Sequence, residues 1–315
     1  MTKIMKYICR GLLLAMAAFL LVACGQTGGQ KANDSNSKLQ VVATTTQVDD
    51  LMKQIGGDHV EVQGLMGPGV DPHGYEPSPS DTKALQNADV VAYSGFHLEA
   101  MFTDLLESLG KEGKATINMS DAVKDSQALA SKEEGLTHDP HIWFSVSIWR
   151  QAAQHAADQL SEIDPDHKDD YQANAKEYIA KLDDLDDYIS QRIEEIPEQS
   201  RYLVTAHDAF NYFGQEYDFE VVGIQGLNSQ TEAGTGDISQ VADLMADNNV
   251  KAVFVESSVS DRNVNALLEA ASARGHSAEI GGELYSDSLG SDDEGTDTYI
   301  AMYKHNVDTI VDALK

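Results

Sequence analysis

Short apolar runs rich in β-branched residues alternate with amphipathic stretches along most of the chain. In the first half, strands are predicted at 39–47, 59–67 and 89–95, each followed by a stretch with helical spacing, at 48–57, 80–88 and 97–110. A longer helix is predicted to open at DPHIWF and to stop near Pro165. Beyond position 200 the alternation resumes, with strands predicted at 201–207, 218–226, 250–257 and 276–282. Strands that alternate with helices build mostly parallel sheets covered by helices, so the pattern predicts two α/β lobes.

The segment between the two halves has a different pattern. From Asp166 to Glu195 apolar residues recur at helical spacing among Asp, Glu and Lys, without Gly or Pro before Pro197. About thirty helical residues would span roughly 45 Å. A coiled-coil dimer is one interpretation, but we favour a single helix lying across both lobes. The predicted lobes are then 39–165 and 198–315, joined by a connecting helix at 166–197.

The N-terminus has the features of an export signal. Lys3, Lys6 and Arg10 precede an uninterrupted apolar run at 11–23, which is too short to favour a permanent membrane span. The run ends in LVAC, which resembles the lipobox of bacterial lipoproteins and implies cleavage before Cys24 and lipidation of its sulfur. Residues 1–23 are then a signal peptide, and 24–38 a polar tether. The alternative is an ordinary signal peptide followed by a chance cysteine.

The net charge and the cysteine content argue against a nucleic-acid-binding protein and against a disulfide-bonded one. With 22 basic and 52 acidic residues, the chain has a formal net charge of −30, which argues against nucleic-acid binding. The charge is typical of a solvated acidic surface, although an acidic field could also concentrate cations. Cys9 would leave with the signal peptide, so Cys24 is the one cysteine of the mature chain and no internal disulfide can form.

Three histidines lie where strands are predicted to meet loops. His73 lies in MGPGVDPHGYEPSPSD, a stretch stiffened by four of the seven prolines. The tripeptide DPH recurs with His141, and His207 ends a predicted strand. In each DPH the aspartate, Asp71 or Asp139, could accept the second ring N–H and fix the tautomer, as metal-bound histidines usually require.

A fourth metal ligand would close such a site. The acidic loop YSDSLGSDDEGTD offers four aspartates, and the residues alone favour Asp287 only slightly, because the others look like a solvated acidic run. Glu256, at the end of another predicted strand, is a candidate to orient a ligand by hydrogen bonding.

The chain resembles the metal-binding lipoproteins of manganese and zinc ABC importers, the cluster A-I solute-binding proteins. The resemblance runs through LVAC, GPGVDPHGYEP, FHLE, DPHIWF, TAHDAFNYF, AVFVESSVS and GELYSDSLG. It implies two α/β lobes joined by one rigid helix, with one metal ion in the cleft between them. The family's four ligands fall on His73 and His141 from the N-terminal lobe and His207 and Asp287 from the C-terminal lobe. It also implies a lipid-anchored monomer on the outer face of the cytoplasmic membrane, with a permease and an ATPase as partners.

Three imidazoles and a carboxylate suit both Mn²⁺ and Zn²⁺. The His-rich loop typical of many zinc-binding members of the family is absent before the second DPH. The sequences around His207 and Asp287 resemble most those of the manganese-associated lipoproteins. We therefore favour Mn²⁺, with Zn²⁺ as the alternative. A zinc hydrolase is disfavoured because Asp287 would fill the open coordination position and no HExxH motif is present. A surface adhesin would leave the four residues unexplained.

Overall fold

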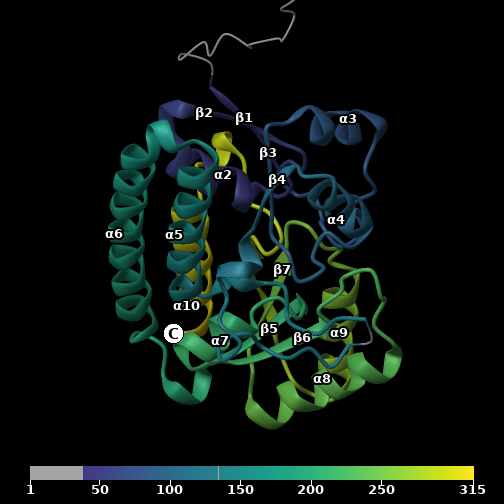
Figure 1. Cartoon of the computed structure of the whole chain (residues 1–315). Helices are drawn as coiled ribbons and strands as arrows, with labels where there is room; N and C mark the ends of the chain where they lie inside the picture. The colour runs from purple at the N-terminus through teal and green to yellow at the C-terminus, as the bar shows by residue number, and fades with distance from the viewer. Residues whose placement is uncertain (1–37, 134) are drawn as a thin grey trace, which may run out of the picture. The chain divides into compact units, whose positions relative to one another are not determined.

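Four parallel strands form the sheet of the N-terminal lobe (Figure 1). The structure is a computed structural model that describes residues 38–133 and 135–315, so the predicted signal peptide and all but the last residue of the tether lie outside it. The strands are β1 (Leu39–Ala43), β2 (Val60–Gly64), β3 (Val90–Tyr93) and β4 (Ala115–Asn118), in the order β2-β1-β3-β4. The sequence pattern predicts the first three of these strands but not β4.

Helices cover both faces of this sheet. The helices are α2 (Thr46–Gly56), α3 (Pro79–Asn87), α4 (Thr103–Lys111) and α5 (Val146–Ile163). Side chains alternate between the two faces of a strand, so Val41 and Val90 point into the core with α2 and α5, whereas Val42 and Val91 pack with α3 and α4. The layered arrangement is that of an α/β sheet.

The C-terminal lobe contains two further parallel pairs of strands. Its strands are β5 (Tyr202–His207), β6 (Glu220–Gln225), β7 (Ala252–Glu256) and β8 (Glu279–Leu284), paired β5 with β6 and β7 with β8. Its helices are α7 (Asn211–Tyr217), α8 (Thr235–Asn248), α9 (Arg262–Ala273) and α10 (Tyr299–Leu314). Val204 packs with α8 and α9, whereas its neighbour Leu203 faces the core that contains α7 and α10.

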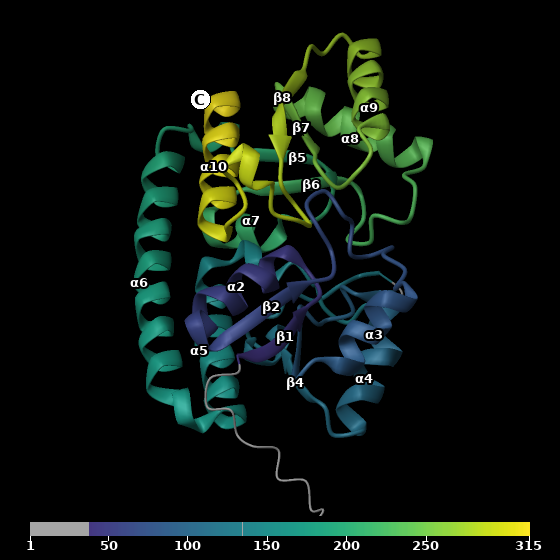
Figure 2. The ribbon, with the colours of Figure 1, turned by 90° about the horizontal axis from the view of Figure 1, so that it is seen from above.

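One long helix lies along both lobes. Helix α6 (Lys168–Ile193) has 26 residues, or about 39 Å at 1.5 Å per residue, slightly shorter than the predicted length. It contacts α2 and α5 of the N-terminal lobe and α10 of the C-terminal lobe, and Figure 2 shows it lying along these helices. The two-lobed α/β fold with a connecting helix is confirmed. No helix among the described residues is long and apolar enough to span a bilayer.

Two helices begin later than predicted. The spacing predicts a helix from His97, but Gly95, Phe96 and His97 all have positive φ, which excludes a right-handed helix there. A 3₁₀ turn follows, and α4 starts only at Thr103.

The second late start follows DPHIWF, where residues 142–144 form a 3₁₀ turn rather than the opening of α5. The Ser145 side chain then accepts the Ile148 N–H and caps α5. His141 therefore precedes the helix and remains free to face the cleft. Other 3₁₀ turns lie at Gly57–His59, Ala100–Phe102, Met119–Ala122, Pro165–His167, Glu198–Ser200 and Asp292–Glu294.

Candidate metal centre

Four buried side chains from distant parts of the chain converge at one point. His73, His141, His207 and Asp287 each offer a ligand atom, and these atoms all lie within 4.8 Å of one another. The Nε2 atom of His141 is 3.3 Å from that of His73 and 3.4 Å from that of His207. These are the four residues that the sequence singled out.

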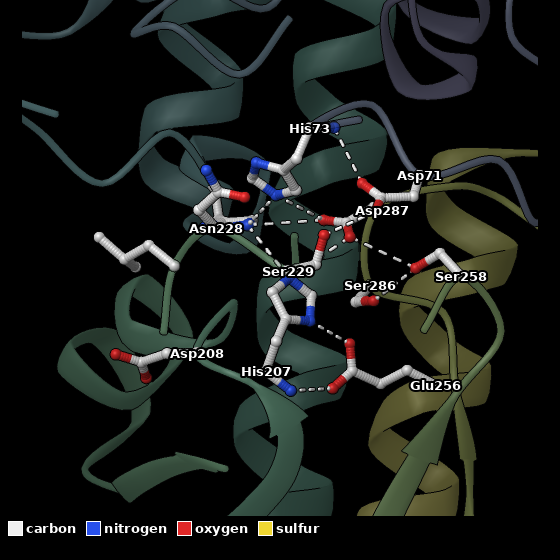
Figure 3. A network of polar contacts seen from close by, with 12 residues as sticks. Asp71, His73, His207, Asp208, Asn228, Ser229, Glu256, Ser258, Ser286 and Asp287 are labelled. Atoms are coloured by element: carbon white, nitrogen blue, oxygen red, sulfur yellow. Dashed lines mark hydrogen bonds and ion pairs between the residues drawn. The ribbon is translucent and has the colours of Figure 1, made fainter. Parts of the chain in front are cut away.

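The Asp287 carboxylate lies against all three imidazoles. Its Oδ1 is 3.7 Å from Nε2 of His73 and 3.5 Å from Nε2 of His141, and its Oδ2 is 3.3 Å from Nε2 of His207. Figure 3 shows His73 and His207 pointing at this carboxylate from opposite sides. The geometry leaves the three Nε2 atoms and one carboxylate facing a common centre.

Each of these side chains is carried by a loop or by the end of a strand. His73 lies in the proline-stiffened loop between β2 and α3, and His207 is the last residue of β5. Asp287 follows β8 by three residues. Ligands in parallel α/β sheets sit beyond the carboxyl ends of the strands. The fold therefore brings these loops to the same cleft.

Two carboxylates orient two of the imidazoles. The Nδ1 atom of His141 is 2.7 Å from Oδ1 of Asp139, and that of His207 is 2.5 Å from Oε2 of Glu256 (Figure 3). Glu256 also accepts the backbone N–H of His207 at 2.9 Å. Each carboxylate places a proton on Nδ1 and turns Nε2 toward the centre, which is the arrangement that metal-bound histidines need.

Asp71 acts differently from the prediction. Its Oδ1 accepts the backbone N–H of His73 at 2.8 Å rather than the ring N–H. Its Oδ2 accepts from the hydroxyl of Ser229 at 2.6 Å and from the amide of Gln230 at 2.7 Å. Both partners lie in the loop between β6 and α8, so Asp71 bridges the two lobes. The proline between Asp71 and His73 fixes the turn that aims the carboxylate at the backbone.

A second carboxylate of the N-terminal lobe holds the same loop. Glu133 accepts the backbone N–H of Leu227 in a short contact and that of Asn228 at 3.2 Å. We call residues 226–230, held by Asp71 and Glu133, the latch loop. Figure 3 shows Asn228 and Ser229 of this loop beside His73 and Asp287.

The carboxylates and imidazoles of the site shift one another's pKa values. Burial lowers the pKa of His141, but the negative charges of Asp139 and Asp287 outweigh it and raise that pKa to about 9. Burial also lowers the pKa of His207, but the negative charges of Glu256 and Asp287 outweigh this effect. The pKa of His207 therefore lies well above its usual range. Burial alone would raise the pKa of Asp287, yet the facing histidines hold it well below its usual range.

The residues present fit a divalent transition metal ion. Asp287 Oδ1 is buried without a hydrogen-bond donor among the described residues, and buried carboxylate oxygens rarely stay unpartnered. Three nitrogen donors and a carboxylate match the ligands that Zn²⁺ and Mn²⁺ accept. The set can bind a cation while both ligand-orienting carboxylates remain hydrogen-bonded.

Two further side chains beside the site have no signal in the sequence. The Ser258 hydroxyl donates to Asp287 Oδ2 at 3.3 Å (Figure 3), and Trp143 lies with its ring centroid 5.3 Å from that of His141. A lone serine and a core tryptophan have no distinctive spacing, so no sequence signal pointed to them. His97 is exposed and His138 packs on Phe96, and neither belongs to the converging set.

Comparison with known proteins agrees with this geometry. Residues 41–313 match the family model described as "Zinc-uptake complex component A periplasmic". The chain is 46% identical over 308 residues to the manganese-binding lipoprotein MntA of Bacillus subtilis, covering 97% of this chain and 99% of the relative. It is 37% identical over 299 residues to the zinc-binding protein TroA of Treponema pallidum, covering 95% and 96%.

Solved structures show the same architecture. The periplasmic zinc-binding protein TroA of Treponema pallidum superimposes with a TM-score of 0.85 at 38% identity, covering 88% of this chain and 99% of that one. A manganese-bound periplasmic metal-binding protein of Candidatus Liberibacter asiaticus gives 0.77 at 26% identity, covering 88% and 100%. These relatives confirm the resemblance derived from the sequence motifs.

Proposed function

The chain belongs to the family of the periplasmic component A of zinc-uptake complexes, and from that premise we propose that it captures a divalent transition metal ion for an ABC importer. His73, His141, His207 and Asp287 are the proposed ligands, with Asp139 and Glu256 orienting two imidazoles and Asp71 fixing the backbone of the His73 loop. The observation that carries the proposal is the buried Asp287 carboxylate, which faces three Nε2 atoms and whose Oδ1 has no hydrogen-bond donor among the described residues.

Mn²⁺ is the proposed physiological ion. The relative at 46% identity is a manganese-binding lipoprotein, and bidentate binding by Asp287 would supply the extra oxygen that Mn²⁺ favours. Zn²⁺ is the second candidate, supported by three imidazoles and by the zinc-binding relative at 37% identity. Zn²⁺ binds such sites more tightly than Mn²⁺, so selectivity must come from geometry and supply.

Metal analysis and competition titration test this choice. We expect protein purified from its host to contain about one equivalent of Mn²⁺ per chain, and His141→Ala to abolish binding. Asp287→Asn should weaken Mn²⁺ more than Zn²⁺, because Mn²⁺ depends more on carboxylate oxygen. Host protein loaded only with Zn²⁺ would instead favour the zinc alternative. No uptake of either ion at stoichiometric concentration would refute the proposal.

Delivery to a permease and its ATPase is the proposed use of the bound ion. We propose that residues 1–23 are a signal peptide and that the mature chain is a monomer. A lipid on Cys24 would anchor the chain to the outer face of the cytoplasmic membrane, with residues 24–38 as the tether. The proposed lobes are 39–165 and 198–315, joined by residues 166–197. A Cys24→Ala variant should be released from the membrane fraction, and retention there would contradict lipid anchoring.

Binding rather than catalysis is the proposed role. Asp287 completes a set of four protein donors, which leaves little room for an activated water. A screen of the metal-loaded chain against ester and phosphoester substrates is expected to show no turnover. Turnover that His141→Ala abolishes would overturn this part of the proposal. An additional role as a surface adhesin would be tested separately, by measuring binding of the protein to cells.

A further inference from the structure

The loop that carries Asp287 follows a strand of the C-terminal lobe and contacts Ser258 of that lobe through Ser286 and Asp287. Several of its other hydrogen bonds reach into the N-terminal lobe. The indole Nε1 of Trp143 donates to the carbonyl of Ser286 at 3.0 Å. Trp143 and Ser286 are both almost fully buried, and Ser286 is the residue directly before Asp287. The N-terminal lobe thus holds the backbone on one side of the ligand.

The other side of Asp287 is held in the same way. The backbone N–H of Leu289 donates to Oγ1 of Thr46, the first residue of α2, at 2.8 Å. The backbone N–H of Gly69, in the loop that contains His73, donates to the hydroxyl of Ser288 at 2.9 Å. Gln47 of α2 also donates to the Ser286 carbonyl, at 3.5 Å. We call 286–289 the Asp287 loop, because hydrogen bonds from three N-terminal segments fix it.

The helix that follows the Asp287 loop is joined to the same lobe. Asp50 of α2 accepts the first backbone N–H of α10, that of Tyr299, at 3.0 Å. The hydroxyl of Tyr299 donates to the carbonyl of Trp143 at 2.7 Å, and the hydroxyl of Tyr303 donates to that of Phe144 at 2.7 Å. These groups are buried, so breaking the bonds without water to replace them is unfavourable.

His207 has the opposite set of contacts. Its backbone and Nδ1 bond to Glu256 of β7, and its strand pairs with β6. Beside it, the latch loop meets the N-terminal lobe through Ser229, which is half-buried, and Gln230, which is exposed. The latch-loop contacts near His207 are part-buried or exposed. On the Asp287 side, the bond from Trp143 to Ser286 is buried, as are the three bonds that join α10 to the N-terminal lobe, whereas the bonds to Leu289 and Ser288 are part-buried.

We propose that Asp287 belongs mechanically to the N-terminal lobe, so that His73, His141 and Asp287 form a fixed half-site and opening of the cleft withdraws His207 alone. Trp143 and Thr46 are the positioning residues that hold Asp287 there. This inference rests on the proposed metal capture and specifies how the ion is released. The hinge then lies between the Asp287 loop and β8, and the latch loop parts from Asp71 and Glu133 as His207 leaves.

The chain's two tryptophans allow a direct test. In ¹⁵N-tryptophan-labelled protein, the two indole N–H signals are assigned with Trp143→Phe. Hydrogen exchange is then compared between Zn²⁺-loaded and chelator-treated protein, Zn²⁺ being the closed-shell probe. We expect the Trp143 indole to stay protected in both states. Exchange that is more than about tenfold faster in metal-free protein would mean that Ser286 leaves with the C-terminal lobe, and would overturn the inference.

A double-mutant cycle gives an independent readout. Trp143→Phe and Thr46→Val should each speed Zn²⁺ dissociation about tenfold, as when a partner of a metal ligand is lost. Trp149→Phe is the matched control, because Trp149 is equally buried but stacks on Tyr299 instead of bonding to the Asp287 loop.

The acceleration should disappear in an Asp287→Asn background and persist in a His207→Ala background. Loss of the effect in the His207→Ala background would show that the bonds merely keep the lobes closed, which contradicts the inference. Absence of Zn²⁺ binding by the unsubstituted protein would instead contradict the proposed function.

Discussion

His207 and His97 each lie near the carboxyl end of a strand in their lobe, but they differ in burial. His207 is fully shielded from water and has its Nε2 3.3 Å from Asp287, whereas His97 is exposed. We therefore expect His207→Ala to weaken Mn²⁺ or Zn²⁺ binding by more than about 100-fold, beyond the range for loss of an orienting partner. His97→Ala should leave the affinity nearly unchanged. Equal losses in calorimetric titrations with a competing chelator would contradict the assignment of His207.

Glu99 of the N-terminal lobe is a matched control for the role of Glu256. Both Glu256 and Glu99 are buried carboxylates that accept backbone N–H groups beside a strand end, but only Glu256 touches a proposed ligand. Glu256→Gln should lower metal affinity by roughly 10–100-fold, because His207 loses a charged partner at Nδ1. Glu99→Gln should lower the free energy of unfolding while leaving affinity within about twofold. A comparable affinity loss in both variants would mean that Glu256 acts only through stability.

At the scale of elements, long periodic segments were predictable and short irregular ones were not. The predicted connecting helix, 166–197, begins two residues before α6 and ends four residues after it, and its existence is clear because its apolar positions repeat over seven turns. Strand β4 is only four residues long, and its sequence ATIN has a single fully buried position, so periodicity could not reveal it. The convergence of His73, His141, His207 and Asp287 needed the family resemblance, because sequence spacing does not state which loops meet.

The turn before α4 offers a test of the strain that delays this helix. Gly95 has φ +87°, and an added Cβ would lie 2.0 Å from Asn118 Oδ1 and 2.3 Å from Ser120 Oγ. Gly113 has nearly the same φ, +86°, but open space around it. Gly113→Ala should cost about 1–2 kcal/mol through backbone strain alone. Gly95→Ala should cost about 1–3 kcal/mol more through overpacking. Equal losses in urea unfolding would show that the contacts with Asn118 and Ser120 are readily relieved.

At the scale of the whole molecule, one apolar core joins the two lobes on the side away from the latch loop. It runs from Val41 and Trp149 through Leu182 of α6 to Val307 of α10. Cores this well packed deform little, so the C-terminal lobe can move only where contacts are polar and hydrated. Such contacts lie at the latch loop. Metal capture should therefore depend on a small, local opening.

Protons and the metal ion compete for the same buried nitrogens, so affinity should follow pH. With the pKa of His141 raised to about 9, the metal-free site retains a proton throughout neutral pH, and binding must release it. The stability that protonated His141 gives metal-free protein is fully present below its unfolded pKa of about 6.5 and is lost as pH rises through about 9.

Apparent affinity should thus rise by at least about tenfold per pH unit between pH 6.5 and 8, because each ion must displace the proton of His141 and the pKa of His207 is raised as well. The rise in melting temperature produced by a fixed Zn²⁺ concentration should grow over the same range. Calorimetry in buffers of different ionisation enthalpy would count the protons released. An affinity that levels off above pH 6.5, as for an isolated imidazole, would mean that Asp139 and Asp287 do not hold the proton on His141, and the coupled charge network would have to be abandoned.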